Sequence, residues 1–245
     1  MKAIFIADAH LRHPEDANYR RLLDLLDQQQ GRLDGLFLLG DIFEFWIGYN
    51  HVVFSEHLPL LARLQQLAED GCRLFFVEGN HDFNMGAFFS KTLNCTLIPD
   101  HKIVDWDGRS IFICHGDLAN PEARGYRLLR AFWRSRFLTV LSRIVHPDAT
   151  WRFGNFLCDL SRKKERYHRD PSAILLPYAR RSLEQGADSF VCGHFHYPLQ
   201  TDIDGRPVTV LGDWITDFSY LVLEDGDFRL ESFQSPAVES ISASG

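Results

Sequence analysis

Apolar runs alternate with helix-like segments along the first half of the chain. The runs are rich in Ile, Leu, Phe and Val, which is typical of buried strands. The segments between them place apolar residues on one helical side, as Leu22, Leu23, Leu25 and Leu26 do. The predicted strands are residues 2–7, 35–39, 73–77 and 95–98, and the predicted helices are 17–30, 56–70 and 84–93. This alternation is typical of βαβ units in an α/β protein.

Later in the chain the pattern changes to pairs of strand-like runs joined by Asp-Gly. An Asp-Gly step between two such runs is a strong hairpin signal. The predicted hairpins pair residues 102–106 with 109–114, 198–203 with 206–211, and 217–223 with 227–233. A helix is predicted to begin near Ser172. The change from βαβ units to hairpins favours two packed sheets over a single parallel sheet.

Five of the apolar runs end in short blocks of Asp, His, Asn and Gly. The blocks are Asp8-Ala9-His10, Gly40-Asp41, Gly79-Asn80-His81-Asp82, His115-Gly116-Asp117 and Gly193-His194-Phe195-His196. Open α/β sheets gather their active sites where strands end at the carboxyl edge. We therefore expect these polar side chains to meet around one point. A single block of this kind is more often a turn, a helix cap or a core residue.

Together the blocks supply the ligands that hard and borderline divalent cations prefer, without cysteine. One predicted ion is held by Asp8, His10, Asp41 and His196. The second is held by Asp41, Asn80, His115 and His194, so that Asp41 bridges the two ions. Two ions ~3.5–4 Å apart clamp a phosphate, lower the pKa of a bridging water and stabilise the oxygens of an in-line displacement. The sequence therefore predicts a two-metal phosphate site.

Length and composition fit one domain with an insertion. The 245 residues are 45% apolar and carry a net charge of −7, which is typical of a globular protein. We expect a domain at 1–234 with a helical insertion at 120–171, followed by a flexible Ser/Ala-rich tail at 235–245. Five cysteines without C-x-x-C spacing suggest a reduced, cytosolic chain. The start MKAIFIADAH does not read as a signal peptide, and no apolar run reaches the ~18–20 residues of a membrane span.

The insertion differs in composition from the rest of the chain. Residues 121–170 contain 12 Lys and Arg against 5 Asp and Glu, a net charge of +7 within a protein of −7. Aromatic and aliphatic residues recur there at helical spacing. One interpretation is an amphipathic helical pair that packs on the core and exposes a basic face. The other is a lid that provides an apolar chamber for acyl chains, cations for a diphosphate, and a surface that rests on an anionic membrane.

The order D-x-H, GD, GNHD, GHxH resembles the calcineurin-like metallophosphoesterases, over most of residues 1–215. The resemblance implies a two-sheet β-sandwich flanked by helices, and a binuclear centre that commonly holds manganese, zinc or iron; we expect Mn²⁺. The run LGDIFEFWIG at 39–48 looks like the UDP-2,3-diacylglucosamine pyrophosphatases of lipid A synthesis. His115-Gly116-Asp117, Gly125-Tyr126 and Leu211-Gly212-Asp213-Trp214 also fit that subfamily. The chain departs from the enterobacterial pattern at His81, where an Arg is expected.

The subfamily resemblance implies hydrolysis of UDP-2,3-diacylglucosamine to UMP and 2,3-diacylglucosamine 1-phosphate, in the cytoplasm at the inner face of the inner membrane. Asn80 is expected to bind the phosphate, and His81 to stabilise the transition state or protonate the leaving oxygen. Asp82 and Asp117 are expected to orient His81 and His115. Substrate contacts are further expected from Trp46, Ser161, Arg162, Lys163 and Lys164.

Three alternatives remain at this point. Another phosphatase or phosphodiesterase, acting on a different and partly apolar phosphate ester, would share the metal site and differ only in its pocket. A nuclease is disfavoured by the acidic balance of the chain, with a sequence pI near 5.9, so no nucleic-acid partner is expected. A non-catalytic scaffold with this fold is disfavoured because all seven ligands and His81 are present. The oligomeric state is left open.

Overall fold

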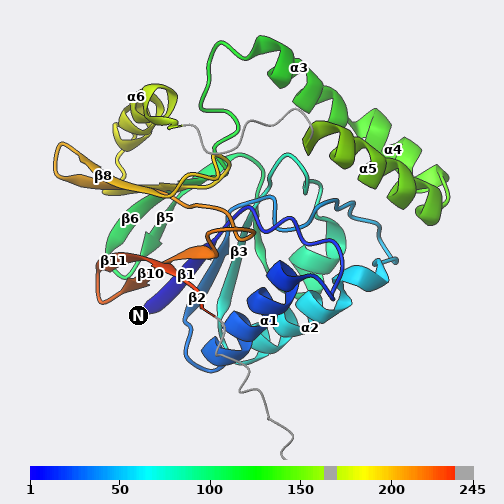
Figure 1. The fold of residues 1–245 in the computed structure, drawn as a ribbon, viewed down its shortest axis with the longest axis horizontal. Coiled ribbons are helices and arrows are strands. Elements are labelled where there is room, and N and C mark those ends of the chain that lie inside the picture. Colours follow the sequence, from blue (N-terminus) through cyan, green and yellow to red (C-terminus); the bar gives the residue numbers. More distant parts are fainter. Residues whose placement is uncertain (163–169, 235–245) are drawn as a thin grey trace, which may run out of the picture.

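Two β-sheets lie face to face in the computed structural model, which describes residues 1–162 and 170–234 (Figure 1). The first sheet has six strands in the order β11-β10-β1-β2-β3-β4. They are β1 (Lys2–Ile6), β2 (Gly35–Leu38), β3 (Arg73–Val77), β4 (Thr96–Ile98), β10 (Ser219–Glu224) and β11 (Asp227–Ser232). Strands β1 to β4 run parallel, and β10 pairs antiparallel with β1. The carboxyl ends of β1, β2 and β3 therefore lie at one edge.

The second sheet has five strands in the order β5-β6-β7-β9-β8. They are β5 (His101–Trp106), β6 (Arg109–Cys114), β7 (Ser189–Cys192), β8 (Leu199–Ile203) and β9 (Arg206–Val210). β6, β7 and β9 run parallel, while β5 and β8 return antiparallel. The three predicted Asp-Gly hairpins are confirmed. Each turn holds its aspartate in the left-handed region, with φ of 52° at Asp107, 54° at Asp204 and 51° at Asp225, which Asp adopts more readily than most residues.

Side chains alternate along each strand and so divide the interior into layers. In β1, Ala3 and Phe5 face the second sheet, while Ile4 and Ile6 face the helices. A stack of aromatic rings fills the space between the sheets: the ring centroids of Phe37 and Phe75 lie 4.4 Å apart, as do those of Phe5 and Phe37. This packed interior fixes the sheets relative to each other, and with them the loops at the carboxyl edge.

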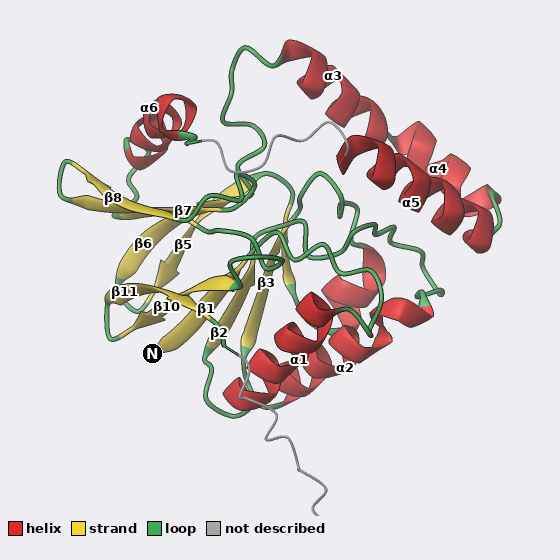
Figure 2. Ribbon diagram, in the orientation of Figure 1, coloured by secondary structure: helices red, strands yellow, loops and turns green. Residues whose placement is uncertain are grey.

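Helices cover both outer faces. α1 (Ala17–Gln29) and α2 (Leu58–Glu69), preceded by the 3₁₀ turn η1 (Ser55–His57), pack on the first sheet through apolar faces that include Leu22 and Leu64. α6 (Ser172–Leu183) packs on the second sheet through Leu175 and Leu183. Figure 2 shows the resulting layers of helix, sheet, sheet and helix. The predicted two-sheet α/β fold flanked by helices is thus confirmed.

Three further helices lie beyond the carboxyl ends of the strands, and we call them together the helical cap (Figure 2). They are α3 (Arg124–Trp133), α4 (Arg136–Ile144) and α5 (Pro147–Arg162). The sequence interpretation of a helical pair is corrected here, because the segment breaks twice. Ser135 caps α4 by accepting a hydrogen bond from the Leu138 backbone N–H at 3.3 Å, and Pro147 occupies the first turn of α5, where it is tolerated.

Most predicted elements match the structure to within a residue or two. The exception is the helix predicted over 84–93, which is shorter: residues 86–92 are helical, and all but the first two of them form the π-helical turn η2 (Phe88–Thr92). The backbone at Asn84 and Gly86 has positive φ, 52° and 80°, which prevents the helix from beginning earlier. The proposed division into a domain at 1–234 with an insertion at 120–171 stays a prediction, and the predicted tail at 235–245 lies outside the described residues.

Candidate metal centre

The seven predicted ligands lie at the ends of five strands. Asp8 and His10 follow β1, Asp41 follows β2, Asn80 follows β3, His115 follows β6, and His194 and His196 follow β7. β1, β2 and β3 are parallel neighbours in the first sheet, and β6 and β7 are parallel neighbours in the second. Because the two sheets pack face to face, these ends meet at one edge of the sandwich.

One group of ligand atoms gathers around Asp8. Donor atoms of Asp8, His10 and His196 all lie within 4.8 Å of one another. His196 Nε2 is 3.6 Å from Asp8 Oδ1, and His10 Nε2 is 4.0 Å from Asp41 Oδ2. These four residues are the first predicted ligand set, and the structure brings them together.

A second group gathers around His115. Donor atoms of Asp41, His115 and His194 lie within 4.8 Å of one another. His115 Nε2 is 3.1 Å from Asn80 Oδ1, 3.2 Å from His194 Nδ1 and 3.5 Å from Asp41 Oδ2. The same oxygen of Asp41 therefore faces His10 on one side and His115 on the other, which is the position that a shared carboxylate would need.

The backbone at the centre takes a conformation that non-glycine residues rarely adopt. Five of the seven predicted ligands have positive φ: Asp8 52°, His10 45°, Asp41 52°, His194 75° and His196 50°. Such conformations cluster at functional sites because surrounding structure must hold them. Here close backbone approach contributes, since a Cβ at Gly79 would collide with Asp41 Oδ1 and one at Gly193 would lie 2.6 Å from Asp8 Oδ2.

The buried charges at this centre interact strongly. Burial disfavours ionised Asp41, but the imidazoles of His115, His81 and His10 outweigh it and hold the pKa of Asp41 well below its usual range. Burial likewise disfavours protonated His115, yet Asp41 raises the pKa of His115 to about 10. Burial, assisted by the neighbouring charge of His115, lowers the pKa of His194 to about 4. The carboxylates and imidazoles are therefore close enough, and buried enough, to change one another's pKa.

This donor set fits divalent cations. The converging atoms are carboxylate oxygens, imidazole nitrogens and one amide oxygen, which suit Mn²⁺, Zn²⁺ and Fe²⁺. Asp8 Oδ1 is buried and accepts no hydrogen bond from any residue in the described ranges. A buried carboxylate oxygen of this kind is costly unless a proton or a cation satisfies it. The residues present can therefore hold the two ions that the motif order implies.

Three further groups orient the ligating imidazoles. His115 Nδ1 donates to the Leu39 carbonyl at 2.8 Å, which turns Nε2 toward the centre. His196 Nδ1 lies 3.4 Å from Asp213 Oδ2, and His10 Nδ1 lies 3.7 Å from Glu44 Oε2. Such carboxylate–histidine contacts fix ring orientation and raise the basicity of the ligand. Sequence reasoning assigned no role to Glu44 or Asp213, although both fall within quoted motifs, LGDIFEFWIG and Leu211 to Trp214.

Asp82 supports the loop that carries Asp41. Its carboxylate accepts backbone N–H bonds from Asp41 at 2.8 Å, Ile42 at 2.6 Å, Phe43 at 3.1 Å and Gly79 at 3.1 Å. These bonds go to the backbone of two ligand loops rather than to the imidazole of His81, which Asp82 was predicted to orient.

Two hydrogen bonds hold His81, one from its backbone N–H and one from its ring. Its N–H donates to Asp41 Oδ1 at 2.9 Å, and its Nδ1 donates to the Glu44 carbonyl at 3.0 Å. The ring meets the ring of His10 edge-on, with centroids 4.8 Å apart. Because Nδ1 carries the proton that this carbonyl accepts, Nε2 is the acceptor nitrogen of the neutral ring.

Comparison with known proteins agrees with this geometry. The calcineurin-like phosphoesterase family model matches residues 1–198. The chain belongs to this family. It is similar to the UDP-2,3-diacylglucosamine hydrolase of Pseudomonas paraeruginosa, at 31% identity over 87% of the chain and 91% of that protein. It is also similar to the hydrolase of the same name from Neisseria meningitidis, at 31% identity over 92% and 95%. A solved archaeal phosphodiesterase aligns over 95% of the chain and 100% of its own, with 12% identity and a TM-score of 0.49.

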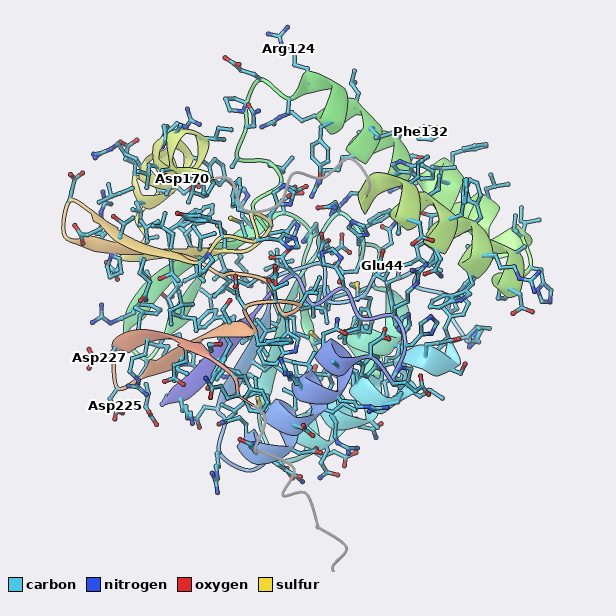
Figure 3. The ribbon with its side chains drawn as sticks, in the orientation of Figure 1. Glu44, Arg124, Phe132, Asp170, Asp225 and Asp227 are labelled. Carbon is cyan, nitrogen blue, oxygen red and sulfur yellow. The ribbon has the colours of Figure 1, made fainter. Side chains whose placement is uncertain are left out.

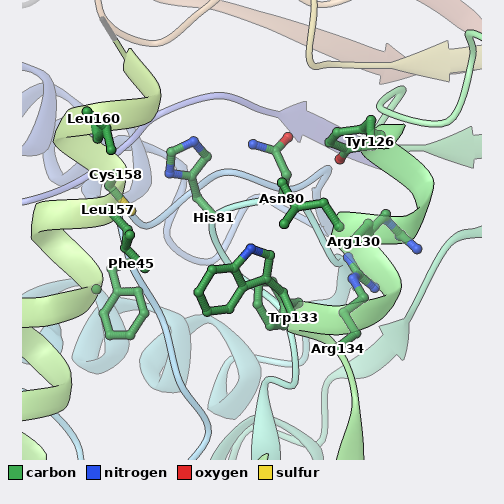
Figure 4. Close-up of a pocket in the computed structure, with 13 residues that line it drawn as sticks. Phe45, Asn80, His81, Tyr126, Arg130, Trp133, Arg134, Leu157, Cys158 and Leu160 are labelled. Carbon is green, nitrogen blue, oxygen red and sulfur yellow. The ribbon is translucent and has the colours of Figure 1, made fainter. Parts of the chain in front are cut away.

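An apolar cavity of about 420 Å³ adjoins the centre of this calcineurin-like phosphoesterase. It lies between α3 and α5, and Asn80 and His81 form part of its wall (Figure 4). Most of the remaining wall is apolar and comes from Phe45, Phe83, Leu129, Trp133, Leu157 and Leu160. We call this cavity the apolar chamber. Asn80 belongs both to this wall and to the predicted ligand set, so the chamber borders the metal centre.

Arginines and Asp117 fasten α3 over the chamber. Asp117 Oδ2 accepts hydrogen bonds from Tyr126 Oη and Arg130 Nε, both at 2.7 Å. Arg134 Nη1 lies 2.9 Å from Glu78 Oε2, and its Nη2 donates to the Gly79 carbonyl at 2.7 Å. Asp117 was predicted to support His115. The hydrogen bonds of its carboxylate go to α3 instead, although its charge also favours protonated His115.

Trp46 was predicted to line the substrate pocket, but it lies in the core and is not among the residues that line the apolar chamber. It is 4% exposed, packs with Phe43 and Phe89 in the core, and donates its indole N–H to the Met85 carbonyl at 3.1 Å. Its neighbour Phe45 lines the chamber instead.

The other residues predicted to contact the substrate are Ser161, Arg162, Lys163 and Lys164. Ser161 and Arg162 complete α5, and their side chains are not described. Lys163 and Lys164 lie outside the described residues. Their proposed roles in substrate binding stay predictions.

Proposed function

We propose that the chain hydrolyses the diphosphate of UDP-2,3-diacylglucosamine to UMP and 2,3-diacylglucosamine 1-phosphate. The observation that carries this proposal is the apolar chamber, which opens onto Asn80 and His81 of the metal centre. A phosphatase for small polar esters does not need such a wall. A substrate with acyl chains does, because burying apolar surface contributes roughly 25 cal/mol per Å². The named relatives support the same substrate.

Two divalent cations, which we propose to be Mn²⁺, would supply charge neutralisation at the phosphate and an acidified water. Asp8, His10, Asp41 and His196 would hold one, and Asp41, Asn80, His115 and His194 the other. The amide of Asn80 also offers Nδ2 to a non-bridging phosphate oxygen, while its Oδ1 faces His115.

In the reaction, the oxygen of water forms a bond to the α-phosphorus, and the bond from that phosphorus to the bridging oxygen breaks. The bridging oxygen leaves with the sugar lipid as its 1-phosphate, and UMP keeps the new oxygen. His81 lies with Asn80 in the wall of the apolar chamber, and its Nδ1 is committed to the Glu44 carbonyl, so Nε2 is the nitrogen that would act on the substrate. It therefore stabilises the departing negative charge, or delivers a proton to the leaving oxygen when the ring is protonated.

The outer side of the helical cap supports a peripheral membrane location. Leu128 is 74% exposed, Phe137 69% and Ile144 77%, and these residues lie among exposed arginines. Arg124 and Phe132 point away from the sheets at the outer side of α3 (Figure 3). An apolar face bordered by cations is suited to an anionic bilayer surface. No helix in the described part of the chain is long and apolar enough to cross a bilayer. We propose that the protein rests on the cytoplasmic face of the inner membrane, where its acylated substrate lies.

The testing experiment follows UMP release from UDP-2,3-diacylglucosamine by Mn²⁺-loaded protein, before and after chelation and after Mn²⁺ is restored. UDP-N-acetylglucosamine, which carries only a short acetyl group and no long acyl chains, serves as the matched control substrate. We expect rapid, chelator-sensitive release from the acylated substrate and little from the control. Equal rates on the two substrates would show that the apolar chamber does not recognise acyl chains. If neither substrate released UMP, the proposed substrate would be rejected.

One observation favours a second candidate, hydrolysis of another apolar phosphate ester. Both described arginines that line the chamber are engaged by protein acids: Arg130 by Asp117 and Asp100, and Arg134 by Glu78. A monoester with one phosphate needs fewer cations than a diphosphate. Hydrolysis of an alkyl phosphate at a higher kcat/KM than the nucleotide lipid would establish this candidate in place of the first.

A further inference from the structure

Helix α5 separates two cavities. Gly154, Leu157 and Cys158 lie on the flank that faces the apolar chamber. Asn155 and Asp159 are rotated by about 100° from Gly154 and Cys158, because successive residues of an α-helix turn by that angle. They line a second cavity of about 340 Å³, which is walled mostly by polar and aromatic side chains. Its wall is Arg12, His13, Trp151, Arg152, Asn155, Phe156 and Asp159.

Arg12 lines this second cavity and belongs to the loop that carries His10 of the metal centre. It follows His10 by two residues in the loop after β1. Its guanidinium lies against the Asp159 carboxylate in a two-pronged contact, with Nη1–Oδ1 at 2.9 Å and Nη2–Oδ2 at 3.1 Å. A guanidinium has five N–H donors, and this contact uses two of them. The remaining donors suit a phosphate oxygen at the edge of the centre.

Asn155 gives the second cavity an unsatisfied acceptor. The residue is 9% exposed, and its Nδ2 donates to the Trp151 carbonyl at 2.9 Å. Its Oδ1 is buried without a hydrogen-bond partner among the residues that the structure describes. Buried amide oxygens are normally paired, and the exceptions call for an explanation. Because Nδ2 is committed, a ligand that completes this site must present an N–H or O–H donor.

We infer that the second cavity binds the nucleoside part of the substrate, so that α5 stands between the nucleoside and the acyl chains. This inference rests on the proposed function. A nucleotide lipid that places its diphosphate at the metal centre extends from it in two directions, and the apolar chamber takes only the acylated sugar. On the other flank, Trp151 and Phe156 provide ring faces for a base, and the Asp159 carboxylate provides acceptors for ribose hydroxyls. Asn155 Oδ1 accepts from the uracil N3–H, a donor that cytosine lacks at the same position.

The test is calorimetric binding of UMP, CMP and methyl phosphate to the Mn²⁺-loaded protein. Wild type is expected to bind UMP about fivefold to tenfold more tightly than CMP, as one hydrogen bond to a neutral base allows. Asn155→Ala should remove this preference. Arg152→Ala, at an exposed position that tolerates truncation, should weaken UMP about fivefold and methyl phosphate less than twofold. Arg136→Ala on α4, an exposed arginine outside the cavity, is the matched control and should bind all three ligands as wild type does.

UMP release from the acylated substrate is measured on the same preparations, which separates the two proposals. If wild type releases UMP but Asn155→Ala and Arg152→Ala bind UMP as wild type does, the nucleoside site is wrong and the proposed function stands. If wild type releases no UMP yet binds UMP with the expected dependence on Asn155 and Arg152, the nucleoside site stands and the acylated substrate is wrong. Equal affinity of wild type for UMP and methyl phosphate would overturn the nucleoside site.

Discussion

The metal centre and the helical cap lie next to each other but are built in opposite ways. At the centre, Asp8 and His115 are 0% exposed, and strand ends, backbone hydrogen bonds and paired charges hold the ligands. On the cap, Ile144 is 77% exposed, and α3 is fastened by a few charged contacts such as Arg134 with Glu78. Catalytic geometry needs rigid support, whereas the proposed acylated substrate and the proposed membrane contact would use apolar surface that is left open. The chain places each in the architecture that suits it.

Asp41→Ala should give the largest effect, because it removes the one carboxylate that faces both halves of the centre. We expect phosphoesterase turnover to fall at least about a thousandfold, since metal-supplied charge stabilisation is worth several kcal/mol. Metal content by mass spectrometry should fall with it. Asp225→Asn in a hairpin turn, whose side chain is 89% exposed, is the control. Full metal content together with normal turnover would show that Asp41 does not bridge.

Asp82→Ala should act next most strongly, although its carboxylate makes no predicted contact with metal. Four backbone N–H groups in two ligand loops would lose their acceptor. We expect a loss of about 10–100-fold in activity, the usual cost of removing an orienting partner, and a loss of about 3 kcal/mol in the free energy of unfolding. Urea unfolding and initial rates measure both. Wild-type activity with lowered stability would limit Asp82 to a structural role.

Arg134→Met should affect the helical cap more than the centre. The change leaves Glu78 without its arginine and loosens α3 over the apolar chamber. We expect KM for the acylated substrate to rise about tenfold, equivalent to about 1.4 kcal/mol, with a smaller change in kcat. Arg136→Met, on the exposed surface of α4, is the matched control. A fall in kcat with KM unchanged would instead place Arg134 with the catalytic groups.

The contrast between the two regions also shows which features the sequence could predict and which it could not. Ligands at strand ends were predictable because an apolar run and the polar block after it are neighbours in the chain, and parallel strands bring such ends together. The contacts of Glu44 with His10 and of Asp213 with His196 depend on loops that meet only in the folded protein, so no local pattern assigns them. Phe45 and Trp46 were confused because adjacent residues of an extended segment face opposite sides, and a one-residue difference exchanges them.

His57 lies where the core meets helix α5 of the helical cap. Of the predicted changes, a substitution here should have the smallest effect on catalysis. Burial lowers the pKa of His57 to about 4, and its ring lies 5.4 Å from the ring of Trp151 on α5. The unfolded chain, with a histidine pKa near 6.5, binds this proton more readily, so His57 makes the free energy of unfolding fall as pH drops from about 6.5 to about 4. His57 accounts for a fall of about 3 kcal/mol in the free energy of unfolding over this pH range.

His57→Phe, which keeps an aromatic ring among Phe43, Trp46 and Trp151, should lose this pH dependence and leave turnover at pH 7.5 within about twofold. Urea unfolding of metal-free wild type and variant at pH 7 and pH 4 measures the difference, with exposed His51→Phe as the control. If wild type and His57→Phe lose the same stability between these pH values, His57 binds its proton equally well in the folded and unfolded protein, and burial does not lower its pKa. The contact between His57 and Trp151 of α5 would then stabilise the fold through packing alone.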